Sequence, residues 1–469
     1  MSPTKRYFFC GVGGSGMLPL ALIVRAQGHA VAGSDRALDQ GRLAEKFDYL
    51  RARGVQLHPQ DGSGVTDAAQ IVVASGAVED TVPDLAAAKR VGAEILRRPT
   101  LLAELFNAAK VGVAIGGTSG KSTVTAMTGW ILHAAGRDPT IMNGAVMKNF
   151  VGDDGPYASA RVGAGETFVA EVDESDGSIA LYAPTVAVLN NIALDHKSMD
   201  ELRALFGDFL AKGKIAVVNL DNDEAARLAR AIQVSDLFSY SVNDPRARWF
   251  ADEVALEQDG ARFVVHERGG DSVAVRLHTP GLHNVSNALA AIAAARACGV
   301  DLAACADALA RFAGVKRRLD VIGTAHGVTV IDDFAHNPDK IAATLRTLHA
   351  FPGRLLVVFQ PHGFGPLRLM RRELAETFAA HMTGDDVLLM TEPVYFGGTT
   401  DRSVSSGDVA ADIAALGKTA IALPDRTACI DRLLTLARAG DRIVIMGARD
   451  DTLTQAAEDL LACISARSA

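Results

Sequence analysis

The sequence lacks most of the features that mark membrane-bound and secreted proteins. It contains no run of about 18 apolar residues, so no membrane-spanning helix is predicted. Its first residues, MSPTKRYFF, do not have the usual layout of a signal peptide. The five cysteines are scattered and no CxxC pair occurs, which argues against a disulfide framework and against a zinc site. We therefore expect a cytoplasmic protein that does not interact with membranes.

Blocks of positive charge are also missing. The chain has 47 Lys and Arg against 55 Asp and Glu, which gives a net charge of −8, and we expect no nucleic-acid partner. Apolar residues make up 49% of the chain and charged residues 22%, as in globular proteins. A chain of 469 residues exceeds the size of one hydrophobic core, so two or three domains are predicted.

Apolar runs and helical stretches alternate along the whole chain, which predicts an α/β fold. In residues 1–107 the alternation is that of a compact doubly wound domain. Residues 108–313 open at a glycine-rich loop and include a strand-rich insert. Residues 314–469 contain five further apolar runs and form the third predicted domain. Hinges between the domains are expected near Asn107 and Gly314.

A glycine-rich motif, GVGGSGM, follows the first predicted strand. Gly11, Gly13 and Gly16 form a GxGxxG pattern, and Asp35 follows about 20 residues later, at the end of the next predicted strand. Such glycines allow a tight turn and let a diphosphate approach the N–H groups at the start of a helix. The acid can accept hydrogen bonds from a ribose or a base. Alone, the motif indicates either a dinucleotide site or a simple tight turn.

A second loop lies within VGVAIGGTSGKSTVT (111–125), between a predicted buried strand and a helix. Successive N–H groups in such a loop can bind phosphate, Lys121 can neutralise phosphate charge, and the Ser122 hydroxyl can ligate Mg²⁺. The loop departs from the full GxxxxGK[ST] spacing because Ile115 stands at the first glycine position. An NAD-dependent dehydrogenase would account for the first loop but not for the second.

Five further motifs follow the second loop in a fixed order. They are EVDESDGS (171–178), NNIALDH (190–196), GLHNVSNALAA (281–291), GVKRR (314–318) and DDFAHNPDKI (332–341). Together with GTSGKST (117–123), they resemble the ATP-dependent Mur ligases of peptidoglycan precursor synthesis over essentially the full length. GVGGSGM and VDESD are most similar to the branch that joins L-alanine to UDP-N-acetylmuramate. The branch that recycles the tripeptide L-alanyl-γ-D-glutamyl-meso-diaminopimelate shares several of the motifs.

The resemblance implies an N-terminal Rossmann-like domain that binds the UDP-sugar and a central P-loop ATPase-like domain that binds ATP. It also implies a C-terminal Rossmann-like domain that binds the acceptor. The implied cofactors are ATP and Mg²⁺, and the implied substrates are UDP-N-acetylmuramate and an amino acid or short peptide. In the family's reaction the lactyl carboxylate attacks the γ-phosphate, and the acceptor amine then attacks the acyl phosphate. We expect a monomer or a homodimer whose domains close for catalysis.

The resemblance also implies roles for individual residues. Lys121, Glu171, His196 and Arg318 would be catalytic, with Glu171, His196 and Ser122 as Mg²⁺ ligands. The other implied ATP-binding positions are Gly117, Thr118, Ser119, Gly120, Thr123, His283, Asn284, Asn287 and Asp333. The implied substrate-binding positions are Gly13, Gly14, Ser15, Gly16, Met17, Asp35, Ser75, Asn191, His336 and His362.

Several positions depart from the pattern of the L-alanine branch. Ser119 stands where that branch usually has a histidine, and Gly363 and Pro366 replace two arginines that suit the carboxylate of the amino acid. A carboxylate bound out of water needs a cation or several N–H donors. Either another arginine substitutes or the acceptor differs. The candidate substitutes are Arg368, Arg371, Arg372 and Arg449.

Three interpretations therefore stay open beside an L-alanine-adding ligase. Within the family, the alternative is the tripeptide-recycling ligase. Outside ligation, a paralogue that binds nucleotides without catalysis is possible, although the set Lys121, Ser122, Glu171 and His196 argues against it. An NAD-dependent dehydrogenase is the alternative from another enzyme class.

Overall fold

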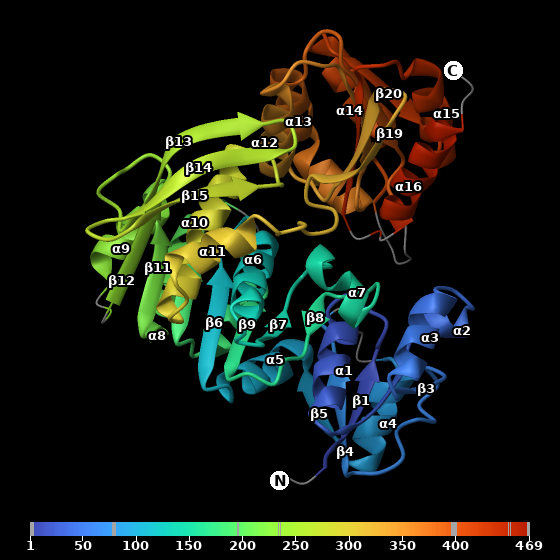
Figure 1. Ribbon diagram of the computed structural model, residues 1–469. Helices are drawn as coiled ribbons and strands as arrows, with labels where there is room; N and C mark the ends of the chain where they lie inside the picture. Colours follow the sequence, from blue (N-terminus) through green and yellow to red (C-terminus); the bar gives the residue numbers. More distant parts are fainter. Residues whose placement is uncertain are drawn as a thin grey trace. The chain divides into compact units, whose positions relative to one another are not determined.

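The computed structural model describes residues 4–76, 81–194, 197–232, 234, 236–394, 401–448, 450 and 452–466. The chain forms two compact units. Unit 1 comprises Met1–Ala255, Ala261–His278 and His283–Gly314, and unit 2 comprises Leu256–Gly260, Thr279–Leu282 and Val315–Ala469. The described residues form three sheets, each flanked by helices (Figure 1).

The first sheet of unit 1 has five parallel strands in the order β3-β2-β1-β4-β5. Its central strand is apolar because helices cover both of its faces: Tyr7 and Phe9 lie in one core cluster and Phe8 lies in another. The strands are β1 (Arg6–Cys10), β2 (Ala30–Ser34), β3 (Gln56–His58), β4 (Gln70–Ala74) and β5 (Glu94–Arg97). The helices are α1 (Met17–Ala26), α2 (Arg36–Asp39), α3 (Ala44–Ala52), α4 (Pro83–Val91) and α5 (Arg98–Asn107).

The second sheet has ten strands in the order β15-β14-β13-β12-β11-β10-β6-β9-β7-β8. Its centre is parallel, and the predicted strand-rich insert forms the strands β14 and β15, which pair antiparallel. The strands are β6 (Val111–Gly116), β7 (Thr140–Met142), β8 (Ala160–Arg161), β9 (Thr167–Glu171), β10 (Val186–Leu189), β11 (Ile215–Asn219), β12 (Asp236–Ser241), β13 (Trp249–Glu257), β14 (Gly260–Glu267) and β15 (Ser272–Leu277). The α-helices are α6 (Lys121–Ala134), α7 (Val151–Asp154), α8 (Met199–Lys212), α9 (Asp223–Ala231), α10 (Leu282–Ala297) and α11 (Leu302–Leu309), and the 3-10 helices are η1 (Lys148–Phe150) and η2 (Ser178–Leu181).

A continuous core joins the two sheets of unit 1. The Phe106 ring of α5 lies 5.7 Å from the Phe168 ring of β9, between centroids. The Asn107 side chain donates to Leu181 O and accepts from Ala183 N, both at 2.9 Å. The residue at which a hinge was expected therefore lies inside a compact unit. The domain boundaries drawn from the sequence stay predictions.

Unit 2 contains a six-stranded sheet in the order β16-β17-β21-β18-β19-β20. Only β16 is antiparallel to its neighbour among the described strands of this sheet. The strands are β16 (Asp320–Ala325), β17 (Val328–Asp333), β18 (Leu355–Gln360), β19 (Val387–Thr391), β20 (Thr419–Leu423) and β21 (Arg442–Gly447). The helices are α12 (Pro338–His349), α13 (Phe364–His381), α14 (Ser406–Ala415), α15 (Arg426–Leu436) and α16 (Thr452–Ser465). The predicted α/β class with largely parallel sheets is confirmed.

The parallel strands bring the predicted motifs to common edges. β1 ends at Cys10, directly before the first glycine loop. In the second sheet, Ile115 of β6 is in register with Glu171 of β9, and Gly116 is in register with Leu189 of β10. Ligands of α/β proteins bind at the carboxyl ends of such strands. The second loop, Glu171 and the segment after Leu189 thus meet at one edge.

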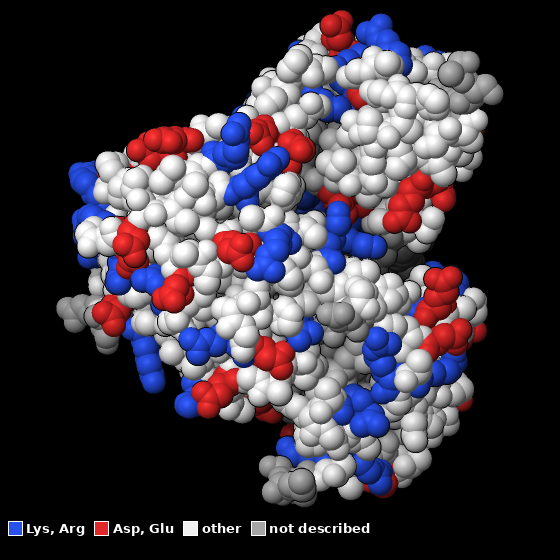
Figure 2. Space-filling model, viewed as in Figure 1, with Lys and Arg blue, Asp and Glu red and all other residues white. Residues whose placement is uncertain are grey.

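The surface carries both kinds of charge. Acidic and basic side chains are interspersed over the face shown in Figure 2. Within the described residues, no helix combines the length and the apolar character that crossing a membrane requires.

Candidate active site

The second loop (residues 117–120) has, at two positions, a left-handed or positive-φ backbone that strongly favours glycine. Gly117 and Gly120 have φ angles of +134° and +82°. A Cβ atom on Gly120 would lie 2.2 Å from Asn190 Nδ2 and 2.6 Å from Asn287 Oδ1. The loop is thus packed against two asparagine side chains, and the close approach leaves no room for a side chain at Gly120.

Lys121, the first residue of α6, is held by two oxygens. Its Nζ donates to Gly117 O at 2.7 Å and forms an ion pair with Glu174 Oε2 at 2.8 Å. Burial acts to lower the pKa of Lys121, but the carboxylates of Glu174 and Glu171 outweigh it, so the pKa is raised above its usual value. The ammonium group therefore stays charged and can neutralise a phosphate.

Ser122 and Glu171 lie side by side, as the motifs imply. Ser122 Oγ donates to Glu171 Oε2 at 2.8 Å, and the same oxygen accepts from Gly144 N at 3.0 Å. A hydroxyl and a carboxylate are the hard oxygen ligands that Mg²⁺ prefers, so this pair fits the ion. The described residues contain no group of three or more His, Cys, Asp or Glu that could hold a metal. His196, the third implied ligand, lies outside the described residues.

Asn191 is hydrogen-bonded to the backbone of the second loop. Its Oδ1 accepts from Ser119 N at 2.9 Å, its Nδ2 donates to Ser119 O at 3.0 Å, and its carbonyl accepts from Thr118 N at 3.1 Å. Asn190, which sequence reasoning did not assign, donates to Ser119 O at 2.9 Å and accepts from the buried Tyr240 hydroxyl at 2.6 Å. Both asparagines hold the backbone of the loop in its bent form.

The asparagines of α10 reach the same loop. Asn287 Oδ1 accepts from Asn190 Nδ2 at 3.0 Å, and Asn287 Nδ2 donates to Asn284 Oδ1 at 3.1 Å. Both α10 asparagines are buried, whereas His283 is exposed. These contacts place Asn284 and Asn287 of the HNVSN motif beside the loop. Both the oxygen and the nitrogen of the Asn287 side-chain amide are thus already hydrogen-bonded within the protein.

The first loop is anchored to the end of β2. Gly11 N and Val12 N donate to Ser34 O at 2.8 and 2.9 Å. Asp35 accepts from Gly13 N at 2.9 Å through Oδ2 and from Ala37 N at 2.8 Å through Oδ1. Both carboxylate oxygens of Asp35 thus bind backbone N–H groups, and any contact with a ribose or a base comes in addition to these.

A buried carboxyl group below the first loop was not predicted. Asp84, fully buried in α4, accepts from Ser34 Oγ at 2.5 Å, from Gly62 N at 3.0 Å and from Cys10 Sγ at 3.6 Å. Burial raises the pKa of Asp84. In the sequence Asp84 stands in an ordinary helical stretch, and no local signal marks it. The predicted Ser75 follows β4 and is half-buried.

In unit 2, two residues implied to bind ATP, Asp333 and Arg318, form hydrogen bonds within the protein. Asp333, buried at the end of β17, accepts from Leu319 N at 3.1 Å and from Thr344 Oγ1 at 2.5 Å. Arg318 donates to Arg317 O at 3.0 Å and lies 4.3 Å above the centre of the Phe334 ring. The Asp333 carboxylate therefore shapes the turn that carries Arg318.

His336 and His362 lie together in unit 2. Their ring centroids are 5.1 Å apart, and His336 Nδ1 is 2.8 Å from Phe334 O. Burial, followed by the charge of Lys340, lowers the pKa of His336 from 6.5 to about 3. His336 is consequently neutral at physiological pH and can take part in hydrogen bonds but not in ion pairs.

The arginines that could replace the two missing ones are already engaged. Arg368 donates to Asp401 at 3.0 Å, Arg371 to Asp412 at 2.6 Å and Arg372 to Glu376 at 2.7 Å. Arg449 lies outside the described residues. Gly363 and Pro366 themselves stand at the start of α13. Each of these three arginines would therefore have to leave its acidic partner, or share it, to bind an acceptor carboxylate.

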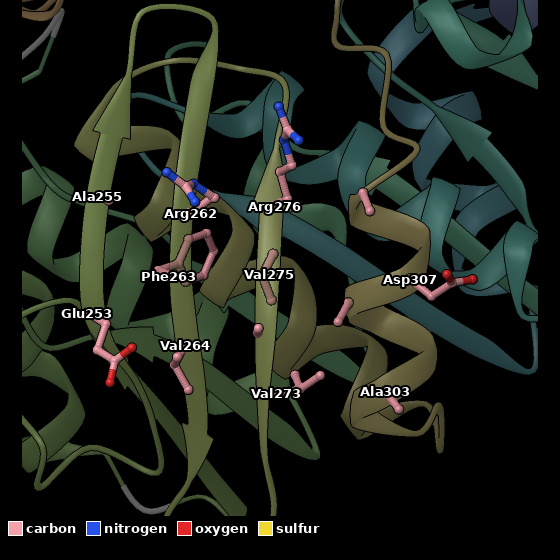
Figure 3. A pocket seen from close by; sticks show the side chains of 13 residues that line it. Glu253, Ala255, Arg262, Phe263, Val264, Val273, Val275, Arg276, Ala303 and Asp307 are labelled. Carbon is pink, nitrogen blue, oxygen red and sulfur yellow. The ribbon is translucent and has the colours of Figure 1, made fainter.

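A cavity of about 630 Å³ lies elsewhere in unit 1, between the antiparallel strands and α11. Figure 3 shows Arg262 and Arg276 on neighbouring strands and Asp307 on the helix at the side of the cavity. Apolar side chains such as Phe263 and Val275 complete its lining. None of the residues implied by the motifs lines this cavity.

Three family models match successive parts of the chain. The model described as "Mur ligase family, catalytic domain" matches residues 6–110, and "Mur ligase middle domain" matches residues 115–295. The model described as "Mur ligase, glutamate ligase domain" matches residues 317–449. The prediction of three α/β domains is thereby confirmed.

Relatives that match nearly the whole chain share one name. The chain is 34% identical over 459 residues to the UDP-N-acetylmuramate–L-alanine ligase of Pelotomaculum thermopropionicum, which covers 96% of each protein. It is 36% identical over 465 residues to the protein of that name from Kineococcus radiotolerans, covering 95% of this chain and 94% of the relative.

Solved structures of several ligases have a similar fold, and two of them match nearly the whole chain. The UDP-N-acetylmuramate–alanine ligase of Thermotoga maritima matches with a TM-score of 0.78 and 24% identity, over 98% of each chain. The murein peptide ligase of Psychrobacter arcticus matches with a TM-score of 0.72 and 26% identity, over 99% of this chain and all of the other.

Proposed function

This chain belongs to the Mur ligase family, and from that premise we propose that it joins L-alanine to the lactyl carboxylate of UDP-N-acetylmuramate while converting ATP to ADP and phosphate. The proposal is carried by the arrangement of Lys121, Ser122 and Glu171 at one edge of the second sheet. The full-length match to L-alanine ligases supports the choice of substrate.

The proposed reaction consists of two group transfers. A lactyl carboxylate oxygen attacks the γ-phosphorus of ATP, the bond to the β–γ bridging oxygen breaks, and an acyl phosphate and ADP result. The amine of L-alanine then attacks the acyl carbon, an amine proton is lost, and phosphate leaves. Both steps depend mainly on positioning and on neutralising charge rather than on a covalent enzyme intermediate.

Residues beside the second loop would supply most of that charge neutralisation. Lys121 would exchange its contact with Glu174 for oxygens of the β- and γ-phosphates. Ser122, Glu171 and, as we propose, His196 would hold Mg²⁺, which neutralises charge on the phosphate oxygens. Arg318, on unit 2, would reach the γ-phosphate in a closed form of the protein. The remaining ATP-binding and substrate-binding residues implied by the motifs are part of the same proposal.

The broader setting is proposed as well. We place the domain boundaries at 107/108 and 313/314 and assign the UDP-sugar, ATP and acceptor to the three domains in that order. The protein would act in the cytoplasm, as a monomer or homodimer, in the synthesis of peptidoglycan precursors. No nucleic-acid or membrane partner is proposed.

A second candidate acceptor is favoured by one feature of unit 2. Gly363 and Pro366 occupy the positions of two arginines suited to an amino-acid carboxylate, and Arg368, Arg371 and Arg372 are paired with acids. A larger acceptor would not need its carboxylate at that place. The tripeptide L-alanyl-γ-D-glutamyl-meso-diaminopimelate is therefore the alternative acceptor.

Phosphate release from Mg-ATP and UDP-N-acetylmuramate tests both proposals, with L-alanine, glycine, L-serine and the γ-linked tripeptide as acceptors. Release with L-alanine, together with the expected ligation product by mass spectrometry, would support the first proposal. Release with the tripeptide alone would support the second. Silence with every acceptor would contradict both.

A further inference from the structure

Arg98, the first residue of α5, lies directly over the last glycine of the first loop. A Cβ atom on Gly16 would be 3.2 Å from Arg98 Cδ and 3.4 Å from Arg98 Nη1. The space that a side chain at position 16 would need is thus filled by the stem and guanidinium group of Arg98. Glycine is therefore favoured at the third position of the motif by the packing of Arg98, and not only by the geometry of the turn.

The positive charge of Arg98 is only loosely balanced. Its Nη2 lies 4.0 Å from Asp176 Oδ2, at the limit of an ion pair, and the side chains of the two residues are 25% and 42% exposed. Asp176 belongs to the segment after β9 that also carries Glu174, and β9 itself ends at Glu171. Arg98 therefore lies between the first loop and the acids beside the second loop, with donors left over.

Backbone donors of the first loop lie next to the same guanidinium group. Gly13 N and Gly14 N are bonded to Asp35 Oδ2 and Gly11 O. In the described part of the chain, Ser15 N and Gly16 N have no acceptor. Two N–H groups and a cation at one place form a site for an anionic group with several oxygens.

We propose that Arg98 binds the diphosphate of the UDP-sugar, together with the N–H groups of Ser15 and Gly16. The planar guanidinium can donate two parallel hydrogen bonds to phosphate oxygens, which a lysine cannot do. The diphosphate is favoured over the lactyl carboxylate because Arg98 covers Gly16 closely, whereas on the side of the second loop its Nη2 comes only within 4.0 Å of Asp176. This inference rests on the proposed function, since it takes the UDP-sugar as the ligand of the first loop.

Calorimetric titration of the full-length protein with UDP and with UDP-N-acetylmuramate, in the absence of ATP, tests the assignment. Arg98→Met should weaken the binding of both ligands alike, by roughly 10- to 100-fold, because a charge-assisted hydrogen bond is lost. Arg98→Lys should show an intermediate loss, and the affinity for Mg-ATP should be unchanged in both variants. Arg90→Met is the matched control, because Arg90 is exposed on the neighbouring helix α4.

Three outcomes would overturn the assignment. Unchanged affinity for UDP in Arg98→Met would remove Arg98 from the diphosphate site. A loss confined to UDP-N-acetylmuramate would place Arg98 at the lactyl carboxylate instead. An equal loss for Mg-ATP would show that Arg98 only supports the fold. If Arg98→Met does not fold, Arg98→Lys carries the test, because it keeps an apolar stem and a charge. Failure of the unaltered protein to bind UDP-N-acetylmuramate would contradict the proposed function itself.

Discussion

Lys121 combines a structural contact with the proposed chemical role. Its ammonium group is buried between Gly117 O and the Glu174 carboxylate, and only 6% of the Glu174 side chain is exposed. Removal of the cation from a buried ion pair strongly destabilises the folded protein, because the carboxylate is left buried without a partner. Any experiment on Lys121 must therefore separate the loss of phosphate binding from the loss of this ion pair.

Replacement of Lys121 by alanine should lower the rate of ADP release by about 100-fold or more, because the main cation of the ATP site is removed. The melting temperature should also fall. The double variant Lys121→Ala/Glu174→Gln should recover stability without recovering activity. Lys110→Ala is the control, since Lys110 is exposed and pairs only with the exposed Glu166 in the described structure. Normal ADP release from Lys121→Ala would contradict the ATP site.

His336 makes the stability of unit 2 dependent on pH. Its pKa is lowered from 6.5 to about 3 in the folded protein, mainly by burial. Between these values the unfolded chain binds a proton that the folded chain does not bind, so stability falls as the pH decreases through this range. At pH values above about 6.5, His336 is neutral in both the folded and the unfolded chain, and this loss of stability is absent.

The variant His336→Gln should therefore lose less stability than the unaltered protein between pH 6.5 and pH 4. Thermal unfolding followed across this range is the measurement. His326→Gln, at an exposed position of the same unit, is the control. Equal slopes of melting temperature against pH in all three proteins would contradict the assigned pKa of His336.

At the scale of elements, the second loop is shaped by a strand end and a helix that are far from it in sequence. Asn190 follows β10, and Asn287 lies on α10, 97 residues further along the chain. Their amides bond to each other and leave space at Gly120 only for a hydrogen atom. The loop is therefore held in its bent form before any ligand arrives.

The variant Gly120→Ala should lose ATP binding and be destabilised by more than about 1 kcal/mol, the usual cost of a left-handed alanine. Gly136→Ala is a matched control: Gly136 has a φ of +74° but nothing within 4 Å of its added Cβ. Equilibrium unfolding and nucleotide titration of the two variants separate backbone strain from the collision with the asparagines. Equal effects would show that the collision is relieved by local movement.

At the scale of the whole molecule, both glycine loops lie in unit 1, and the residues implied at the acceptor side lie in unit 2. A ligand that binds only the folded protein stabilises it by about 2.7 kcal/mol at 100 times its dissociation constant. The two loops predict two separate ligands for unit 1, a UDP-sugar and ATP.

UDP-N-acetylmuramate and Mg-ATP should each raise the melting temperature of unit 1, whereas NAD should have no effect. Differential scanning calorimetry of the full chain resolves the units if they unfold separately. UDP serves as the control for the nucleotide part of the sugar substrate. Stabilisation by NAD and not by UDP-N-acetylmuramate would favour the dehydrogenase interpretation of the first loop.

The sequence alone determined the α/β class, the three-domain organisation and the family, because each depends on local patterns. A phosphate loop is a short run of consecutive residues between a strand and a helix, and its glycines and lysine can be read directly. The order of the motifs along the chain then made the set specific. Substrate-site residues inferred from those motifs remain proposals.

Only the tertiary structure decided which side chains support and surround those loops. Glu174 meets Lys121 across 53 residues, Asp84 meets Ser34 across 50, and Arg98 covers Gly16 from another helix. None of these contacts has a local signature, because a buried ion pair or a close approach depends on how distant elements pack. The same packing paired two of the candidate substitute arginines of unit 2, Arg368 and Arg371, with Asp401 and Asp412, which sequence spacing could not show.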